Sequence, residues 1–238
     1  MTYIEGFILA VPSANKQAYI DHAANAAPLF REFGATRMME NWGDDVPGGK
    51  VNDFMGAVRA TADETVLFSW IEYLDKPARD AAVDRIMNDP RMAAVGAGMP
   101  FDGKRMVYGG FEVIVDDGSS AGCGYVDGFL LPVSADRKDA YLDMARIGSA
   151  VFRDHGALRV VEAWGDDVPD GEVTDFRKGA HAKDGENVVY SWVEWSDKTA
   201  RDAGMKAVMA DERMNPPAGM PFDGQRMIYG GFATILDA

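Results

Sequence analysis

The chain of 238 residues contains two copies of one sequence unit, and this internal repeat constrains its fold more than any other feature. Residues 3–54 align with residues 125–176 at a constant offset of 122, and from Met99 onward the offset is 121. A unit of this size usually folds as a domain. We therefore expect two similar domains, at residues 1–116 and 125–238, joined by a flexible linker at 117–124. Fused copies often form within one chain what a homodimer forms from two, so we predict a monomeric pseudo-dimer and leave a higher oligomer open.

Hydrophobic periodicity and turn residues give the order of elements in one repeat. A helix is predicted at 16–33 that ends at Gly34, and a second helix begins after Asp75 as its cap and runs to about Asn88. The predicted strands are 3–11, 36–42, 54–60, 65–73 and 104–115. The resulting order, β-α-β-β-β-α-β, is that of a ferredoxin-like α+β fold with one added strand.

Composition argues against several classes of partner. The formal net charge is −14 and the 24 lysine and arginine residues are scattered among acids, so we expect neither nucleic acid nor an anionic membrane as a partner. No apolar stretch approaches the roughly 20 residues of a membrane span, and the N-terminus lacks the pattern of a signal peptide. We therefore expect a cytoplasmic protein. The single cysteine, Cys123, can form neither an intrachain disulfide nor a multi-cysteine metal site.

The histidines argue against a catalytic or metal centre present in both copies. The positions equivalent to His22, His155 and His181 hold Met144, Phe33 and Arg59. A duplicated haem, zinc or Ser-His-Asp site is therefore not expected. The acidic loop at 43–47 lacks the alternating spacing of a calcium loop, so we predict a solvated turn there and no metal. No motif indicates a cofactor.

Several sequence runs are specific enough to point to a family: GDDVPxGxVxDF, SWxEYxxKxxRDA, DPRM and MPFDGKRMxYGGFE. They resemble those of the YbaA-like bacterial proteins of unknown function, the DUF1428 family, nearly end to end in each repeat. The resemblance implies a dimeric α/β-barrel fold, in which two ferredoxin-like sheets face each other across a shared interior, and it implies no activity. The second copy departs from the pattern at 215–217, so the loop before the last strand is expected to differ between the halves.

Strand alternation places acidic and aromatic side chains on common faces. Glu40 and Trp42 share one face of their predicted strand, and Trp70 and Glu72 share one face of theirs. If these faces line the shared interior, burial raises the carboxyl pKa values and a basic partner such as Arg37 lowers them, which would create an acid-base pocket. With their equivalents, the residues of the predicted ligand pocket are Glu40, Trp42, Trp70, Glu72, Arg105, Tyr108, Glu162, Trp164, Trp192, Glu194, Arg226 and Tyr229.

Each of these residue types also has a purely structural interpretation. The acids can lie at the solvent rim or pair with arginines, and aromatic strand residues more often form a core than a stacking platform. Two functions therefore stay open, and no motif decides whether the protein is an enzyme. One is small-molecule binding between the two sheets, with cofactor-independent oxygenase, isomerase or lyase chemistry suggested by fold analogy. The other is a non-catalytic structural or partner-binding protein, which a packed interior with every acid paired to arginine would favour.

Overall fold

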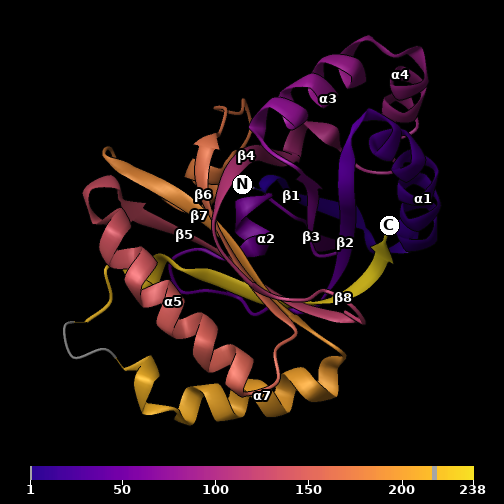
Figure 1. Cartoon of the computed structure of the whole chain (residues 1–238). Coiled ribbons are helices and arrows are strands. Elements are labelled where there is room, and N and C mark those ends of the chain that lie inside the picture. The colour runs from indigo at the N-terminus through magenta and orange to yellow at the C-terminus, as the bar shows by residue number, and fades with distance from the viewer. Residues whose placement is uncertain (1, 216–218) are drawn as a thin grey trace.

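The computed structural model describes residues 2–215 and 219–238, and its eight strands form one closed barrel (Figure 1). The strand order is β1-β3-β2-β8-β5-β7-β6-β4, with four strands from each repeat. The first repeat contains β1 (Tyr3–Pro12), α1 (Lys16–Phe33), β2 (Ala35–Asp45), α2 (Phe54–Ala57), β3 (Glu64–Tyr73), α3 (Lys76–Asn88), α4 (Pro90–Ala97) and β4 (Val107–Gly118). The second contains β5 (Tyr125–Ser134), α5 (Lys138–Asp154), β6 (Arg159–Asp167), α6 (Phe176–Gly179), β7 (Glu186–Trp195), α7 (Lys198–Ala210) and β8 (Ile228–Asp237).

Two antiparallel pairings between the repeats close the barrel. Strand β2 pairs with β8, and β4 pairs with β6. Register shifts interrupt both pairings, between Glu40 and Asn41 and between Val113 and Val115, and such bulges bend and twist the strands that contain them. The two repeats of one chain thus build a single barrel.

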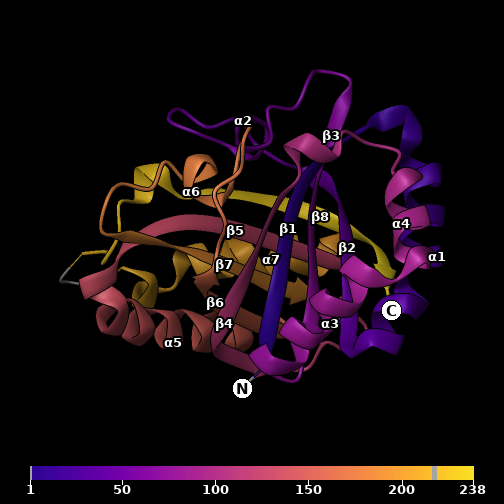
Figure 2. The same cartoon turned by 90° about the horizontal axis from the view of Figure 1, so that it is seen from above.

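Helices cover the outside of the barrel. Figures 1 and 2 show α1, α3 and α4 over the strands of the first repeat, and α5 and α7 over those of the second. Tyr19 and Ala23 of α1 pack with Leu67 and Ile71 of β3 in this outer core. Among the described residues, no helix is long and apolar enough to cross a membrane. Because helices cover the outer surface, apolar side chains are buried on both faces of the strands.

Aromatic side chains from both repeats fill the inside of the barrel. The rings of Phe68 and Tyr190 stack with their centroids 4.3 Å apart, and those of Trp70 and Trp192 stack at 4.2 Å. A Cβ atom on Gly128 would lie 2.5 Å from the ring of Phe68, so this strand position needs a glycine for the ring to pack against the backbone. The inner core is therefore a packed aromatic cluster.

Residues 54–60 differ from the prediction, because they begin with the short helix α2 and contain no strand. The Oδ1 atom of Asp53 accepts a hydrogen bond from the Gly56 amide at 2.6 Å and caps this helical turn. Phe54, Ala57 and Val58 belong to the inner core, and their separations of three and four residues place them on one face of a helix. Each repeat contributes four strands to the barrel, and the predicted fifth strand is wrong.

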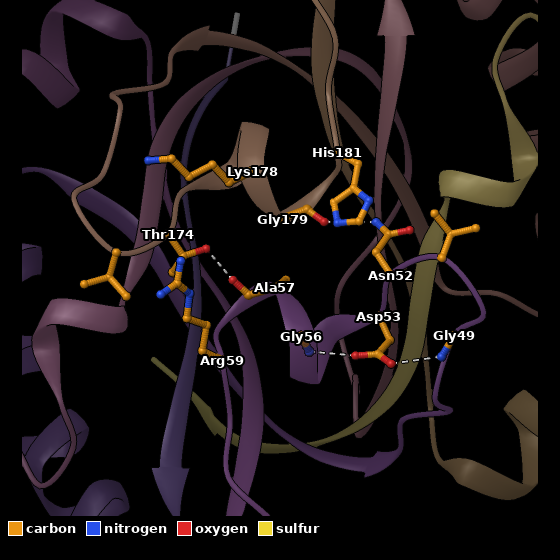
Figure 3. Close-up of a pocket in the computed structure, with 12 residues that line it drawn as sticks. Gly49, Asn52, Asp53, Gly56, Ala57, Arg59, Thr174, Lys178, Gly179 and His181 are labelled. Carbon is orange, nitrogen blue, oxygen red and sulfur yellow. Dashed lines mark hydrogen bonds between the residues drawn. The ribbon is translucent and has the colours of Figure 1, made fainter.

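The helices α2 and α6 lie together across one end of the barrel (Figure 3). The Asn52 amide donates a hydrogen bond to the Gly179 carbonyl at 2.9 Å. The Thr174 hydroxyl donates to the Ala57 carbonyl at 2.5 Å. These two equivalent bonds tie the repeats together at this end.

The other predicted boundaries agree closely with the structure. Helix α1 spans the predicted residues, and Gly34 ends it with a left-handed φ of 116°. The Asp75 carboxylate caps α3 by accepting from the Ala78 amide at 2.9 Å. Strand β4 extends to Gly118 and so includes the first two residues of the predicted linker.

The loop before the last strand was expected to differ between the halves. The first repeat forms helix α4 here, whereas the second forms a 3-10 turn at Glu212–Met214. Pro216 and Pro217, which prompted the expectation, lie outside the described residues.

Candidate functional site

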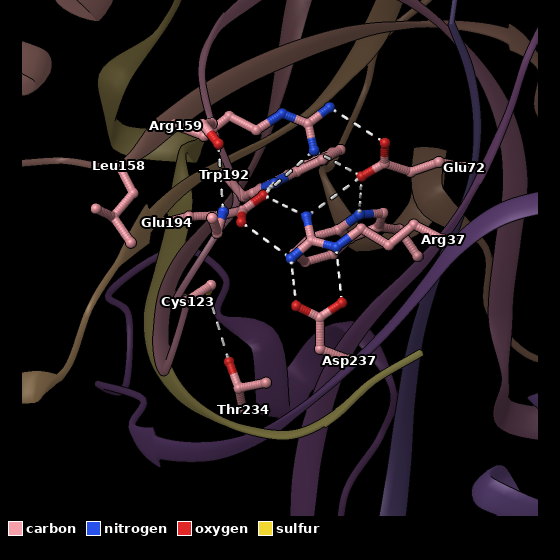
Figure 4. Close-up of polar contacts among 12 residues, drawn as sticks. Arg37, Glu72, Cys123, Leu158, Arg159, Trp192, Glu194, Thr234 and Asp237 are labelled. Atoms are coloured by element: carbon pink, nitrogen blue, oxygen red, sulfur yellow. Dashed lines mark hydrogen bonds and ion pairs between the residues drawn. The ribbon is translucent and has the colours of Figure 1, made fainter.

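A network of arginine and carboxylate side chains, called the arginine network below, closes the barrel end opposite α2 and α6 (Figure 4). Its members are Arg37, Glu72, Asp116, Arg159, Glu194 and Asp237. Arg159 donates to Glu72 at 2.7 Å, and the equivalent Arg37 donates to Glu194 at 2.9 Å. Both ion pairs cross from one repeat to the other. The arginine network therefore joins the repeats at this end.

The structure brings four of the predicted pocket residues together beside this network. The indole of Trp70 donates to Glu72, and that of Trp192 donates to Glu194, both at 3.1 Å. Stacked rings and ion pairs occupy the space between the two sheets, so a ligand there would have to displace them. The expected pocket between the sheets is thus filled by the protein's own side chains.

Glu40 and Trp42 lie on the opposite face of the sheet and point toward the helices. The register of β2 and β3 pairs Met39 with Trp70 and Glu40 with Ser69. Because side chains alternate along a strand, Met39 joins the inner core while Glu40 and Ser69 face α1. Glu40 and Trp42 therefore do not share one pocket with Trp70 and Glu72 as predicted.

The Glu40 carboxyl is buried in a cluster of hydroxyl groups. The Tyr19 hydroxyl of α1 donates to its Oε2 atom at 2.7 Å, and the Ser69 hydroxyl donates to the same atom. Glu162 accepts from Tyr141 at 2.6 Å in the same way. We call these clusters the Tyr-Glu-Ser triads; their members are Tyr19, Glu40 and Ser69, and Tyr141, Glu162 and Ser191.

Burial makes both triad carboxyls weaker acids than an ordinary glutamic acid. It raises the pKa of Glu40 and of Glu162 to about 7, although hydrogen bonds from the neighbouring hydroxyls act in the opposite direction. A carboxyl with such a pKa is partly protonated at neutral pH and can both donate and accept a proton. Groups with strongly shifted pKa values are concentrated at functional sites, so the triads are the candidate site.

Aromatic and basic side chains surround the first triad. The Lys16 ammonium lies 5.1 Å from the ring centre of Trp42. The half-buried ring of Phe101 lies 5.8 Å from that of Tyr19 and covers it. The second repeat has the same arrangement with Trp164, Lys138, Phe222 and Tyr141. Among the described residues, no group of three or more His, Cys, Asp or Glu side chains is placed to hold a metal ion.

The raised pKa values predict that the triads reduce stability as the pH rises. Between about pH 4.5 and 7 the carboxyls ionise in the unfolded chain, where the ordinary pKa is 4.5, but Glu40 and Glu162 stay protonated in the folded protein. The folded state then binds more protons, so the free energy of unfolding falls with rising pH, by up to about 3 kcal/mol per group. Changing both residues to Gln is expected to remove this contribution, measured by urea unfolding across this window.

The exposed Glu32, which pairs with Arg91, provides a control for this comparison. Glu32→Gln should leave the slope of stability against pH between pH 5 and 7 as it is in the wild type. Equal slopes for the wild type and the double Gln variant would contradict the raised pKa values.

The remaining predicted pocket residues lie at the end of the barrel near α2 and α6, away from the triads. Arg105 holds Glu64 with two hydrogen bonds, at 2.6 and 2.8 Å, and this ion pair lowers the pKa of Glu64 to about 2. Arg226 holds Glu186 in the same way. Tyr108 and Tyr229 are about half exposed, at 46% and 47%. The twelve predicted residues are therefore divided among the arginine network, the triads of the two repeats and the barrel end near α2 and α6, and they do not form one pocket.

Sequence reasoning missed the hydroxyl partners of the triad carboxyls. Tyr19 and Ser69 have identical equivalents, Tyr141 and Ser191, at the offset of 122. This identity alone did not separate them from the many other positions shared by the repeats.

Comparison with known proteins agrees with the resemblance seen in the motifs. The model of a family described as a protein of unknown function, DUF1428, matches residues 2–103 and again residues 124–224. The chain belongs to this family. A relative, the uncharacterized protein YbaA of Escherichia coli K12, is 59% identical over 117 residues, which are 49% of this chain and 100% of YbaA. The YbaA of Shigella flexneri gives the same values. One repeat of this DUF1428 chain therefore corresponds to a whole YbaA.

Solved structures with the same barrel have very different sequences. A putative monooxygenase from Lactobacillus acidophilus NCFM superposes with a TM-score of 0.62 at 11% identity, covering 100% of this chain and 95% of the other. A putative monooxygenase from Fusobacterium nucleatum gives 0.61 at 10% identity, covering 99% and 93%. An anthrone oxidase-like protein gives 0.56 at 12% identity, covering 100% and 92%. At these identities the likeness shows the fold alone.

Proposed function

We propose that each repeat holds an acid-base site between its sheet and its first helix, where Glu40 or Glu162 exchanges a proton with a small organic molecule. The observation that carries this proposal is the carboxyl buried behind the first helix and held by hydroxyl groups in both repeats, and this burial raises its pKa to about 7. Its position differs from the expected site between the sheets, because the aromatic inner core already occupies that space.

Removal of a proton from a weakly acidic C–H group is a step common to the reactions considered for this fold. Isomerases return the proton to another atom, lyases expel a leaving group, and cofactor-independent oxygenases let the carbanion react with dioxygen. A base with a pKa near 7 serves this step because it accepts a proton readily and also releases it again at neutral pH. The hydroxyl groups of Tyr19 and Ser69 donate to the ionised carboxylate and stabilise it before the substrate binds.

Access to the site requires movement of its cover. In the first repeat the half-buried Phe101 packs on Tyr19, and the Asn15 side chain holds this loop by a 2.8 Å hydrogen bond to the Pro100 carbonyl. Displacement of Phe101 would expose the ring of Tyr19 to a flat molecule. We propose this route because Phe101 is the partly exposed ring that lies against the triad.

A non-catalytic function has an observation of its own. The inner core is tightly packed, and the interior carboxylates Glu72 and Glu194 are paired with Arg159 and Arg37. In that case the triads are buried hydrogen-bonded groups that hold α1 and α5 on the barrel, and the protein acts through a partner or through its assembly.

Hydrogen-deuterium exchange at carbon separates these two functions. The probe is anthrone, chosen because an anthrone oxidase-like protein shares the fold. Loss of its acidic C–H signal in D2O buffer is followed by NMR with and without protein. We expect the wild type to accelerate the exchange, and Glu40→Gln combined with Glu162→Gln to lose about 100-fold or more of that acceleration, as is usual for removal of a general base.

The exposed carboxyl Glu32 supplies the matched control, and Glu32→Gln should keep the full rate. Phe101→Ala should raise the rate, since it removes the cover. The non-catalytic function would be favoured if neither the wild type nor Phe101→Ala exchanges the acidic C–H hydrogen of anthrone faster than buffer does.

A further inference from the structure

A cavity of about 350 Å³ lies between α2 and α6, and none of its lining residues belongs to the Tyr-Glu-Ser triads (Figure 3). Both repeats line it, and its polar members are Asn52, Asp53, Arg59, Thr174, Lys178 and His181. Its volume lies within the range of about 300 to 1,000 Å³ that is typical of small-molecule pockets. The acid-base proposal does not use this space.

Two residues of the cavity have an unusual backbone conformation. Arg59 and His181, at equivalent positions, are the non-glycine residues with positive φ in the described part of the chain, at 51° and 52°. This conformation is unfavourable for a residue with a Cβ atom. The Arg105 guanidinium donates to the Arg59 carbonyl at 2.9 Å, and Arg226 donates to the His181 carbonyl at 3.0 Å. Both repeats thus hold a strained residue at the cavity, and strain of this kind is concentrated at functional sites.

The charges around the cavity differ from those of the whole chain, whose net charge is −14. The polar contacts of Arg59 and His181 within the described residues are made by their backbone atoms, which leaves the guanidinium and the imidazole free for a ligand. Lys178 pairs with Asp175 at 2.8 Å. The Asp53 carboxylate also lines the cavity, and each of its two oxygens accepts one backbone amide hydrogen. Arg59 and His181 are therefore the lining residues whose side-chain polar groups make no contact within the described residues, and both are basic.

Asn52 adds a hydrogen-bond acceptor. Its side-chain NH2 donates to the carbonyls of Gly179 at 2.9 Å and Arg226 at 3.3 Å, which fixes the orientation of the amide. Its Oδ1 atom is buried and has no partner among the described residues. Unpaired buried oxygens are uncommon, because their desolvation is costly. Because the atom is buried, a small shift of the lining must expose it before the hydroxyl group of a ligand can donate to it.

We propose that this cavity binds a small organic anion that also carries a hydroxyl group, a hydroxycarboxylate. Arg59 and His181 lie on opposite sides of the α2 and α6 pair (Figure 3), so each contacts a carboxylate of its own, and Asn52 Oδ1 accepts a hydrogen bond from the hydroxyl. Arg105 and Arg226 donate hydrogen bonds to the carbonyls of Arg59 and His181, and these bonds hold the two left-handed residues and their basic side chains in place.

Titration with L-malate, followed by two-dimensional ¹H-¹⁵N NMR of the full chain, tests the proposal. We expect saturable shifts of the Gly49 and Gly179 amides, whose residues line the cavity. Arg59→Asn and His181→Asn remove a basic group but keep a residue that tolerates the left-handed conformation. Each is expected to weaken binding about tenfold or more, as for the loss of one charge-assisted hydrogen bond.

The control variant is Arg146→Gln, which removes an exposed arginine from α5, outside the cavity lining. It should leave the malate affinity unchanged, and the spectra themselves report whether each variant is folded. Shifts that grow without saturating, or an affinity that both Asn variants retain, would overturn the proposal. Succinate, which lacks the hydroxyl, is expected to bind more weakly than malate, and equal affinity would remove the role of Asn52.

Discussion

Arg159→Met is expected to lower the free energy of unfolding by about 3–5 kcal/mol, since it breaks a buried ion pair and leaves its partners in place. Arg159 is nearly buried and bridges Glu72 of the other repeat, at 2.7 Å, and Asp116. Methionine fills similar space but leaves Glu72 without this charge in a site from which water is largely excluded. Urea unfolding followed by circular dichroism measures the loss.

A second substitution separates lost charge pairing from lost packing. Arg159→Met combined with Glu72→Gln removes both charges of the pair. The double variant should therefore lose less free energy of unfolding than the two single variants lose in sum. The control is Arg213→Met, which removes an exposed arginine that bridges Asp154 and Asp211 and should cost less than about 1 kcal/mol. If Arg159→Met costs no more than Arg213→Met, the arginine network does not hold the repeats together.

Trp192→Ala is expected to lower the free energy of unfolding by a similar amount, about 3–5 kcal/mol, for a different reason. The Trp192 side chain is fully buried, stacks on Trp70 at 4.2 Å, and donates its indole hydrogen to Glu194. Alanine leaves a cavity between the repeats and removes one hydrogen bond from a buried carboxylate. The measurement is again urea unfolding, with near-ultraviolet circular dichroism to follow the stacked indoles.

Tyr229→Ala truncates an aromatic residue that is 47% exposed, and it serves as the control for this deletion. It should change stability by less than about 1 kcal/mol, because little buried surface is lost. Trp192→Phe keeps most of the ring but not the indole hydrogen, so an intermediate loss is expected. A small loss in Trp192→Ala would mean that the inner core closes around the missing ring.

Much of the fold was predictable because the repeat and local signals agree. The offset of 122 predicted two similar halves, and Gly34 and Asp75 correctly predicted the end of α1 and the start of α3. Residues 54–60 were predicted wrongly because Phe54 and Val58, four residues apart, lie on one face of a strand as well as on one face of a helix, whereas Ala57 fits the helix alone. The Asp53 cap decides in favour of the helix, and an aspartate directly before an apolar run is a start signal for a helix that the strand prediction leaves out.

The site was less predictable, for a reason that lies in the architecture. Alternation correctly grouped Glu40 with Trp42 and Trp70 with Glu72, but it does not say which face of a strand is inside. In a barrel covered by helices both faces are apolar, so hydropathy gives no sign of the direction. The pairing of Met39 with Trp70 shows which face of β2 lies inside the barrel. This pairing depends on the register between strands, which the sequence of one strand does not contain.

The linker between the repeats has a consequence for recognition. A homodimer of a single-repeat chain can place only identical residues around its axis, so a ligand without symmetry binds there in two equivalent orientations. Here Arg59 faces the cavity from one repeat and His181 from the other, and Gly56 is matched by Lys178. Covalent fusion has thus freed the two halves to diverge, so the cavity can distinguish the head of a bound molecule from its tail.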